Sequence, residues 1–225
     1  MRQIKIYDTT LRDGTQAEDF NLSLADKIRI AQKLAQLGIH YIEGGWPGAN
    51  PVSVEYFQKI QGMNLKHAKI SAFGSTRHFR NKAEKDPNLL ALLDARTPVI
   101  TIFGKSWDVH VRDALNIGLD DNLLLIEDSL AFLRPKVEHL FYDAEHFFDG
   151  FKDNPDYALA TLGRAIDGGA ETIILCDTNG GTLPQELPPI IDRVKQHLAG
   201  CSRTVRLGIH SHNDSETAVA NSLLA

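Results

Sequence analysis

Two histidines separated by one residue, His210 and His212, are the strongest candidates for chemistry in this sequence. They follow the apolar run Val205–Ile209, which is typical of a buried strand. Residues two apart on a strand point to the same side, so both imidazoles are expected to face the same way. Paired imidazoles are common ligands of a divalent cation. The alternative is two surface histidines beside a helix start, and the pair alone does not decide between them.

A second candidate segment lies near the other end of the chain, at Asp8–Gln16, directly after the first apolar run. Asp13 offers a carboxylate, and a carboxylate with two imidazoles leaves positions on a cation open for water and a chelating substrate. Arg12 beside it is placed to stabilise a developing oxyanion. Taken alone, the segment is better interpreted as a polar turn with a surface Arg–Asp pair of little energetic value.

Two further polar segments follow the fifth and sixth apolar runs. Glu145 is a candidate acid, base or orienting group, and its alternative is a solvated loop carboxylate. Thr178 precedes the pair Gly180–Gly181, and a hydroxyl with glycine-exposed N–H groups suits a substrate carboxylate. The alternative there is an ordinary turn. Cys176 is interpreted as a small core residue rather than a catalytic thiol.

The elements that must position these residues recur along the chain as short apolar runs, each followed by a polar loop and an amphipathic stretch. Several of the stretches carry helix start signals, namely Ser23 with Asp26, Asn154 with Pro155, and Thr182 with Pro184. Strands that alternate with helices predict an α/β fold. The predicted strands are Ile4–Tyr7, Tyr41–Glu43, Lys69–Phe73, Pro98–Phe103, Val137–Tyr142, Thr172–Cys176 and Val205–His210.

Polar residues follow nearly every predicted strand, among them Glu43, Ser75 and Lys105. A (β/α)₈ TIM barrel brings all of these strand ends to one mouth, whereas an open doubly wound sheet uses mainly its switch point. No G-x-G-x-x-G turn supports the open sheet. We therefore expect a TIM barrel with seven of its eight βα units, in which residues 1–225 form one catalytic domain that is incomplete at its C-terminus. Asp13 and the two histidines then face each other across the missing unit.

Composition excludes several other classes of protein. The chain has 24 Lys+Arg and 29 Asp+Glu, and a net charge of −5 argues against nucleic acid or an anionic membrane as the main partner. The longest apolar stretches, such as Pro98–Phe103, are far shorter than the roughly 18 residues of a membrane span. The first ten residues hold no signal-peptide core. Two cysteines form no disulfide framework, so we expect a cytoplasmic protein.

Several motifs together resemble one family, the DRE-TIM metallolyases, which include 2-isopropylmalate, homocitrate and citramalate synthases. They are D-T-T-L-R-D-G-x-Q from Asp8, D-A-E from Asp143, D-T-x-G from Asp177 and H-x-H-N-D from His210. Further stretches are similar to the citramalate synthase branch, namely Ile42–Gly48, Ala72–Thr76, Phe103–Asp108 and Asp143–Gly150. The resemblance covers the whole chain in order. The family's eighth-strand G-N-x-x-x-x-G-N segment, its C-terminal domains and the histidine they supply have no counterpart before Ala225.

The resemblance implies roles for particular residues. Asp13, His210 and His212 match the metal ligands of the family, and the metal would be Mg²⁺, Mn²⁺ or Zn²⁺. Arg12 matches the arginine that stabilises the enolate and oxyanion, and Glu145 matches the acidic member of the Asp-Arg-Glu signature. The remaining two matches concern substrate binding: Thr178 matches a hydroxyl that contacts the carboxylate of a 2-oxo acid, and Gln16 matches a glutamine near the metal.

The activity that the resemblance implies is condensation of acetyl-CoA, as co-substrate, with pyruvate and water to give (R)-citramalate and CoA, on a pyruvate route to isoleucine. The alternatives are 2-isopropylmalate or homocitrate synthesis from another 2-oxo acid, and a related metal-dependent carbon–carbon lyase. A metal-binding barrel with a structural or regulatory role is the alternative outside catalysis. The implied partners are small molecules, and the implied full-length assembly is a homodimer.

Overall fold

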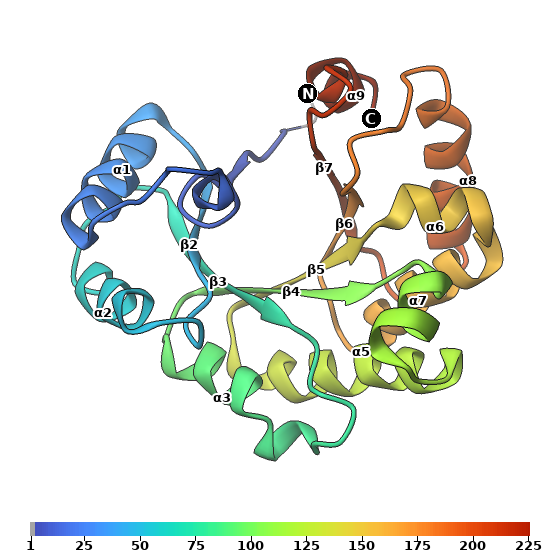
Figure 1. Ribbon diagram of the computed structural model, residues 1–225, viewed down its shortest axis with the longest axis horizontal. Helices are drawn as coiled ribbons and strands as arrows, with labels where there is room; N and C mark the ends of the chain where they lie inside the picture. The colour runs from blue at the N-terminus through green and yellow to red at the C-terminus, as the bar shows by residue number, and fades with distance from the viewer. Residues whose placement is uncertain (1–2) are drawn as a thin grey trace.

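Seven parallel strands, hydrogen-bonded in chain order, form one curled sheet in the computed structural model, which describes residues 3–225 (Figure 1). The sequence therefore folds as its alternating pattern predicts, with a helical connection between successive strands. The strands are β1 (Tyr7–Asp8), β2 (Tyr41–Gly45), β3 (Lys69–Ser75), β4 (Val99–Lys105), β5 (His139–Glu145), β6 (Thr172–Asp177) and β7 (Arg206–Ser211).

Strand order decides between the two architectures that the sequence allows. Each strand from β2 to β6 pairs in parallel with the strands before and after it in the chain. A doubly wound sheet would reverse its order at a switch point, and no such reversal occurs among the described strands. The sheet curls as a barrel wall with helices on its outer side (Figure 1). The fold is α/β and contains seven of the eight units of a TIM barrel, as predicted.

The helices lie outside the sheet and connect successive strands (Figure 1). Longer helices follow the polar loops, and short helical turns occupy parts of the loops themselves. The helices are α1 (Leu24–Leu37), α2 (Pro51–Ile60), α3 (Pro87–Asp94), α4 (Asp108–His110), α5 (Leu119–Leu133), α6 (Phe147–Asp153), α7 (Pro155–Asp167), α8 (Leu187–Ala199) and α9 (Ala218–Leu224). The short turns are η1 (Asp13–Gln16), η2 (Ala83–Lys85), η3 (Val111–Leu115) and η4 (Arg134–Lys136).

Two of the three helix starts that the sequence signals are confirmed. Ser23 and Asp26 form a capping box at the start of α1, and the Asn154 side chain accepts a hydrogen bond from the Tyr157 N–H at the start of α7. The third prediction, a helix start at Thr182, is wrong because α8 begins at Leu187. Thr182 instead donates its hydroxyl to Asp177, at 2.9 Å, and so fixes the loop that follows β6.

The predicted first strand, Ile4–Tyr7, is also corrected, because the regular ladder of β1 covers only Tyr7–Asp8. The Ile6 carbonyl still accepts the N–H groups of His40 and Tyr41 at the start of β2, and the Ile6 N–H donates to the His40 ring. The side chains of Ile4 and Ile6 are nevertheless 80% and 53% exposed. Within residues 3–225 no strand covers the outer edge of β1, and these apolar side chains remain largely exposed. Apolar sequence alone therefore overestimates the strand.

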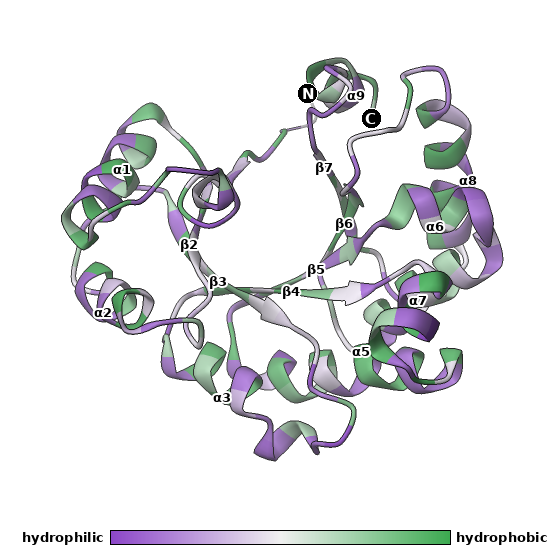
Figure 2. Ribbon diagram, in the orientation of Figure 1, coloured by the Kyte–Doolittle hydropathy of each residue, from purple (hydrophilic) through white to green (hydrophobic). Residues whose placement is uncertain are grey.

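Side chains alternate between two cores along each strand. Those on the outer face pack against the helices, as Ile100, Ile102 and Leu140 do. Those on the inner face form a second cluster inside the curl, where Val99, Phe141 and Cys176 pack with neighbouring aromatic rings. Hydrophobic residues therefore fill most of the central strands, and hydrophilic residues gather on the loops and outer helix surfaces (Figure 2). This double burial explains why the strand sequences are nearly continuous apolar runs.

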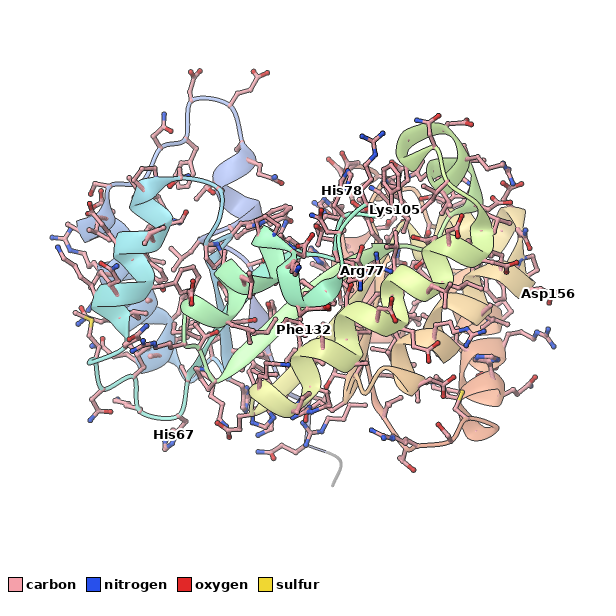
Figure 3. All side chains as sticks on the ribbon, turned by 90° about the horizontal axis from the view of Figure 1, so that it is seen from below. His67, Arg77, His78, Lys105, Phe132 and Asp156 are labelled. Carbon is pink, nitrogen blue, oxygen red and sulfur yellow. The ribbon has the colours of Figure 1, made fainter. Side chains whose placement is uncertain are left out.

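All seven strands point the same way, so their carboxyl ends lie at one end of the molecule. Lys105 at the end of β4 marks this end, and His67 before β3 marks the opposite one (Figure 3). In TIM barrels the loops at the carboxyl end of the strands carry the functional side chains. The polar residues that the sequence analysis singled out lie at or just after these strand ends.

Candidate active site

Asp13, His210 and His212 meet at the mouth of the curled sheet. The Oδ2 atom of Asp13 lies 3.4 Å from Nε2 of His210 and 3.6 Å from Nε2 of His212. One ligand atom from each residue lies within 4.8 Å of the others. The two imidazole rings stack at 5.0 Å between centroids, which confirms that the spacing of two places them on one side. A carboxylate and two imidazoles at these distances fit a single divalent cation.

The loop after β1 turns Asp13 toward β7. Both carboxylate oxygens of Asp8 accept hydrogen bonds from Thr10, and the Thr9 carbonyl accepts the N–H groups of Arg12 and Gly14. Leu11 between them is fully buried and anchors the turn in the core. These contacts shape the loop, and Asp13 enters the site as the first residue of η1.

The loop after β7 is held by the neighbouring loop after β6. The His212 N–H donates to the Asp177 carbonyl at 3.2 Å, and the Ser215 N–H donates to the Gly180 carbonyl at 3.2 Å. These bonds fix both histidines, because His210 belongs to β7 and His212 follows directly after it. Two adjacent loops of the sheet thus build one half of the site.

Asp13 and His210 shift each other's pKa values toward their charged forms. The hydrogen bond with His210 holds the pKa of Asp13 below its usual value, with help from Arg12. Burial alone would lower the pKa of His210, but the surrounding carboxylates, Asp13 first, raise it overall. Asp13 is therefore ionised at neutral pH, which is the form a cation requires.

Arg12 is fixed on three sides. Its Nε donates to Oε1 of Glu43, its Nη1 donates to Asp13 at 3.1 Å, and its guanidinium carbon lies 3.8 Å from the centre of the Phe73 ring. Glu43 is fully buried, whereas the side chain of Arg12 remains 15% exposed toward the mouth. The guanidinium is thus oriented before any substrate arrives, and preorganised charge is what stabilises an oxyanion.

Glu43 is a candidate functional residue whose contact with Arg12 sequence reasoning did not identify. It accepts a second hydrogen bond from the Tyr7 hydroxyl, at 2.6 Å, and Tyr7 in turn contacts the Thr101 hydroxyl at 2.9 Å. These residues come from β1, β2 and β4 and lie on the inner face of the curl. The available signal was a charged residue inside the otherwise buried strand Tyr41–Gly45, since an unpaired charge there would be costly.

Asp143, the first residue of the D-A-E motif, is a second carboxyl on the inner face of the sheet. Its side chain lies on β5, next to the interior groups that include Glu43. Burial, and then repulsion by Glu43, raises the pKa of Asp143 to about 7. The interior below the mouth therefore holds two carboxyl groups in addition to Asp13.

The other predicted site residues do not join this cluster. Glu145 forms an ion pair with Lys105 rather than with Arg12, so the carboxylate that holds Arg12 is Glu43. The Thr178 hydroxyl accepts the His146 N–H at 2.9 Å, beside the ends of β5 and β6. Gln16 is exposed at the end of η1. The structure thus joins Arg12 to the three proposed ligands and places the remaining residues around them.

Comparison with known proteins identifies the family to which this arrangement belongs. The profile of the HMGL-like family matches residues 3–225. The chain belongs to the HMGL-like family. This confirms the resemblance to the DRE-TIM metallolyases drawn from the motifs. All the candidate residues described above lie within the matched HMGL-like region.

Curated relatives of this HMGL-like chain include synthases of two kinds. The (R)-citramalate synthase of Geobacter sulfurreducens is 59% identical over 225 residues, which is 100% of this chain and 42% of the relative. A 2-isopropylmalate synthase of Synechococcus sp. strain WH7803 is 34% identical and is matched over 99% of this chain and 40% of its own length. The chain thus spans about two-fifths of the length of these relatives.

Solved structures support the fold. An HMG-CoA lyase from Bacillus subtilis superposes with a TM-score of 0.79 at 18% identity, covering 100% of this chain and 73% of that one. At such low identity the likeness concerns architecture alone.

Among the helices of residues 3–225, none combines the length and apolar character needed to cross a membrane.

Proposed function

We propose that this HMGL-like chain is the catalytic barrel of a metal-dependent acyltransferase that condenses acetyl-CoA with pyruvate and water to give (R)-citramalate and CoA. The observation that carries the proposal is the convergence of Asp13, His210 and His212 beside a preoriented Arg12. We choose pyruvate as the 2-oxo acid because the whole chain is 59% identical to an (R)-citramalate synthase.

Asp13, His210 and His212 are the residues that would hold the divalent cation, which we take to be Mg²⁺, Mn²⁺ or Zn²⁺. When bound, such a cation withdraws electron density from the carbonyl of a chelating 2-oxo acid. The three donors come from two sides of the mouth and leave the solvent side free. A bound 2-oxo acid would therefore sit between the donors and the open mouth.

Arg12 would stabilise the negative charge that develops on the substrate oxygen. Its contacts with Glu43 and Asp13 occupy Nε and one terminal nitrogen, so the other terminal nitrogen keeps its donors for substrate. Glu43 acts as a positioning residue, because it contacts Arg12 and Tyr7 from a fully buried place. The buried Glu43 also compensates the charge of the guanidinium.

Thr178, Gln16 and Glu145 are proposed to complete the substrate site. The Thr178 hydroxyl oxygen already accepts the His146 N–H, so its own proton is free to bind a substrate carboxylate. Gln16 would contact substrate from the exposed end of η1. Glu145, paired with Lys105 at the end of the strands, would serve in proton transfer or orientation at the mouth.

Three statements about the whole protein extend the proposal. We place the reaction on a pyruvate route to isoleucine, assign the protein to the cytoplasm, and expect the full-length chain to act as a homodimer. The isoleucine route and the homodimer are what the family resemblance implies, and the cytoplasmic assignment rests on the two cysteines, which form no disulfide framework.

The substrate is tested by assaying CoA release from acetyl-CoA with a panel of 2-oxo acids, using the full-length protein. We expect kcat/KM for pyruvate to exceed that for 2-oxoisovalerate by about tenfold or more, since one or two methylenes change discrimination by roughly 1–3 kcal/mol each. Better use of 2-oxoisovalerate would instead assign 2-isopropylmalate synthesis. CoA release with none of the 2-oxo acids would refute a synthase.

The metal ligands are tested separately, by counting bound Mn²⁺ per chain. The double variant His210→Ala, His212→Ala should lose the bound ion and the metal-dependent activity while its fold remains. His67→Ala is the matched control, because His67 is exposed at the opposite end of the molecule (Figure 3). Unchanged Mn²⁺ stoichiometry in the double variant would overturn the assignment.

A further inference from the structure

A second group of potential metal ligands lies behind the first, on the inner face of the sheet. Asp143, Cys176 and His210 each offer one ligand atom, and these atoms lie within 4.8 Å of one another. They come from the three adjacent strands β5, β6 and β7, and Cys176 is the register partner of His210. Strand pairing therefore fixes the three side chains relative to one another.

The carboxyl group of Asp143 has an unused acceptor in this group. Its side chain is only 5% exposed, and its Oδ1 atom has no hydrogen-bond partner among the described residues. A buried polar atom without a partner costs free energy, and most such atoms in native proteins are paired. An ion or ligand at this place would satisfy the oxygen.

We propose that Asp143, Cys176 and His210 form a binding site for a thiophilic divalent cation such as Zn²⁺ or Cd²⁺. The set combines one sulfur, one nitrogen and one oxygen donor, and thiolate with imidazole suits soft cations. The set of Asp13, His210 and His212 contains no sulfur and suits harder cations better. The two sets differ in donor chemistry, although they share one histidine.

The shared histidine makes the two sites mutually exclusive. A neutral imidazole has one nitrogen lone pair available for a metal, because its other nitrogen carries the proton. His210 can therefore serve the ion held with Asp13 and His212, or the ion held with Asp143 and Cys176, but not both at once. A thiophilic cation in the inner site would remove a ligand from the outer site.

Cation binding at Asp143, Cys176 and His210 releases protons and changes the charge of the interior. As the cation binds, the Cys176 thiol releases its proton to solvent, and any proton carried by Asp143 or on the ligating nitrogen of His210 leaves as well, because metal ligands bind in their deprotonated forms. The incoming cation faces Asp143 and lies in an interior that also contains the carboxylate of Glu43. Arg12 is a cation already committed to Glu43 and Asp13, so a further positive charge compensates Asp143.

The direct test is a Cd²⁺ titration of the full chain, with the ultraviolet thiolate-to-metal charge-transfer band as the signal. We expect the band in the wild type and in Cys201→Ser, and its loss in Cys176→Ser. Cys201 is the matched control because it is the other cysteine of the sequence and lies outside the donor set. A full band in Cys176→Ser, or none in the wild type, would overturn the proposal.

Three additional measurements control for loss of the fold and test the donor set and the mutual exclusion. Equal unfolding midpoints of Cys176→Ser and Cys201→Ser show that loss of the band is not loss of the fold, and Asp143→Asn should lower the Cd²⁺ affinity by about tenfold or more. Excess Mn²⁺ should displace Cd²⁺ and reduce the band, whereas simultaneous binding of both ions would refute mutual exclusion. Because the signal is spectroscopic, it is independent of whether the protein condenses acetyl-CoA with pyruvate.

Discussion

At the scale of single residues, the chemistry of Arg12 is set by its neighbours more than by its type. An exposed arginine beside Asp13 would be an ordinary surface pair, worth little. Here the guanidinium also contacts the fully buried Glu43 and lies over the Phe73 ring, so its orientation is fixed. The positive charge of Arg12 is thereby held at a defined place beside Asp13.

Glu43→Ala should lower the free energy of unfolding by about 3–5 kcal/mol, because removing one partner of a buried ion pair leaves the other uncompensated. Urea denaturation monitored by circular dichroism measures the change. Glu145→Ala is the matched comparison, since Glu145 pairs with Lys105 where both side chains are partly exposed, and its loss should cost about 0–1 kcal/mol. Equal losses of unfolding free energy in the two variants would show that the buried Glu43–Arg12 pair matters no more to stability than the partly exposed Glu145–Lys105 pair.

At the scale of elements, the loops after β6 and β7 support each other through close backbone contact. Gly180 has a φ of +59°, and a Cβ atom there would lie 2.6 Å from Oδ2 of Asp214 and 2.9 Å from its backbone nitrogen. Only glycine allows this approach without strain. The neighbouring loop carries His212, so the contact positions a proposed metal ligand indirectly.

Gly180→Ala should therefore weaken Mn²⁺ binding, by about tenfold if a strain of 1–3 kcal/mol is relieved by moving the loop. Isothermal titration calorimetry measures the dissociation constant. Gly181→Ala is the control, because nothing lies within 4 Å of a Cβ at that position and its φ is not in the left-handed region. If both variants bind Mn²⁺ like the wild type, the loop contact does not position the histidines.

Helix α3 offers a prediction about pH. Asp86 is 1% exposed and accepts hydrogen bonds from the N–H groups of Asn88 and Leu89 at the helix start, and from His78 and Asn81. Burial would raise the pKa of Asp86, but the hydrogen bonds from Asn81 and the backbone outweigh it, so the pKa is lowered. The stabilisation is therefore present above about pH 4 and is lost as the pH falls below that value.

Asp86→Ala should accordingly cost about 2–3 kcal/mol near neutral pH, from the lost cap and the other hydrogen bonds. The difference from the wild type should shrink in urea titrations carried out below pH 4. Asp26→Ala, at the exposed start of α1, should cost less than Asp86→Ala at neutral pH, because water can replace the lost hydrogen bonds there. A difference for Asp86→Ala that grows in acid would contradict the sign of the pKa shift.

At the scale of the whole molecule, the proposed outer metal site joins the two ends of the sheet. Asp13 follows the first strand, and His210 ends the seventh. Within residues 3–225 neither β1 nor β7 has a strand partner on its outer edge. A cation held by both sides would therefore connect two edges that backbone hydrogen bonds leave unconnected.

Mn²⁺ at about 100 times its dissociation constant should stabilise the folded state by about 2.7 kcal/mol. The melting temperature should rise accordingly in the wild type and in Glu18→Gln, an exposed acidic residue of the same loop region. Asp13→Asn should abolish the rise, because the amide replaces the carboxylate that bridges to the histidines. A metal-dependent rise that persists in Asp13→Asn would exclude the proposed link between the strands.

The sequence by itself determined the α/β class, the number and order of the strands, and the meeting of Asp13 with His210 and His212. These follow from local periodicity and chain order, because parallel strands in sequence order place every carboxyl end at one mouth. Local sequence signals did not predict the bounds of every element, because some bounds depend on tertiary neighbours. The first strand is shorter than its apolar sequence suggests, and the helix start expected at Thr182 lies at Leu187.

Only the tertiary structure decided which buried polar groups meet. Glu43 holds Arg12 from 31 residues away, and Asp143 meets Cys176 and His210 across three strands. Such contacts depend on the register between strands and on the curl of the sheet, which bring inner-face side chains of distant segments together. The sequence of each strand shows which residues are buried, but the partner of a buried charge is set by the neighbouring strand.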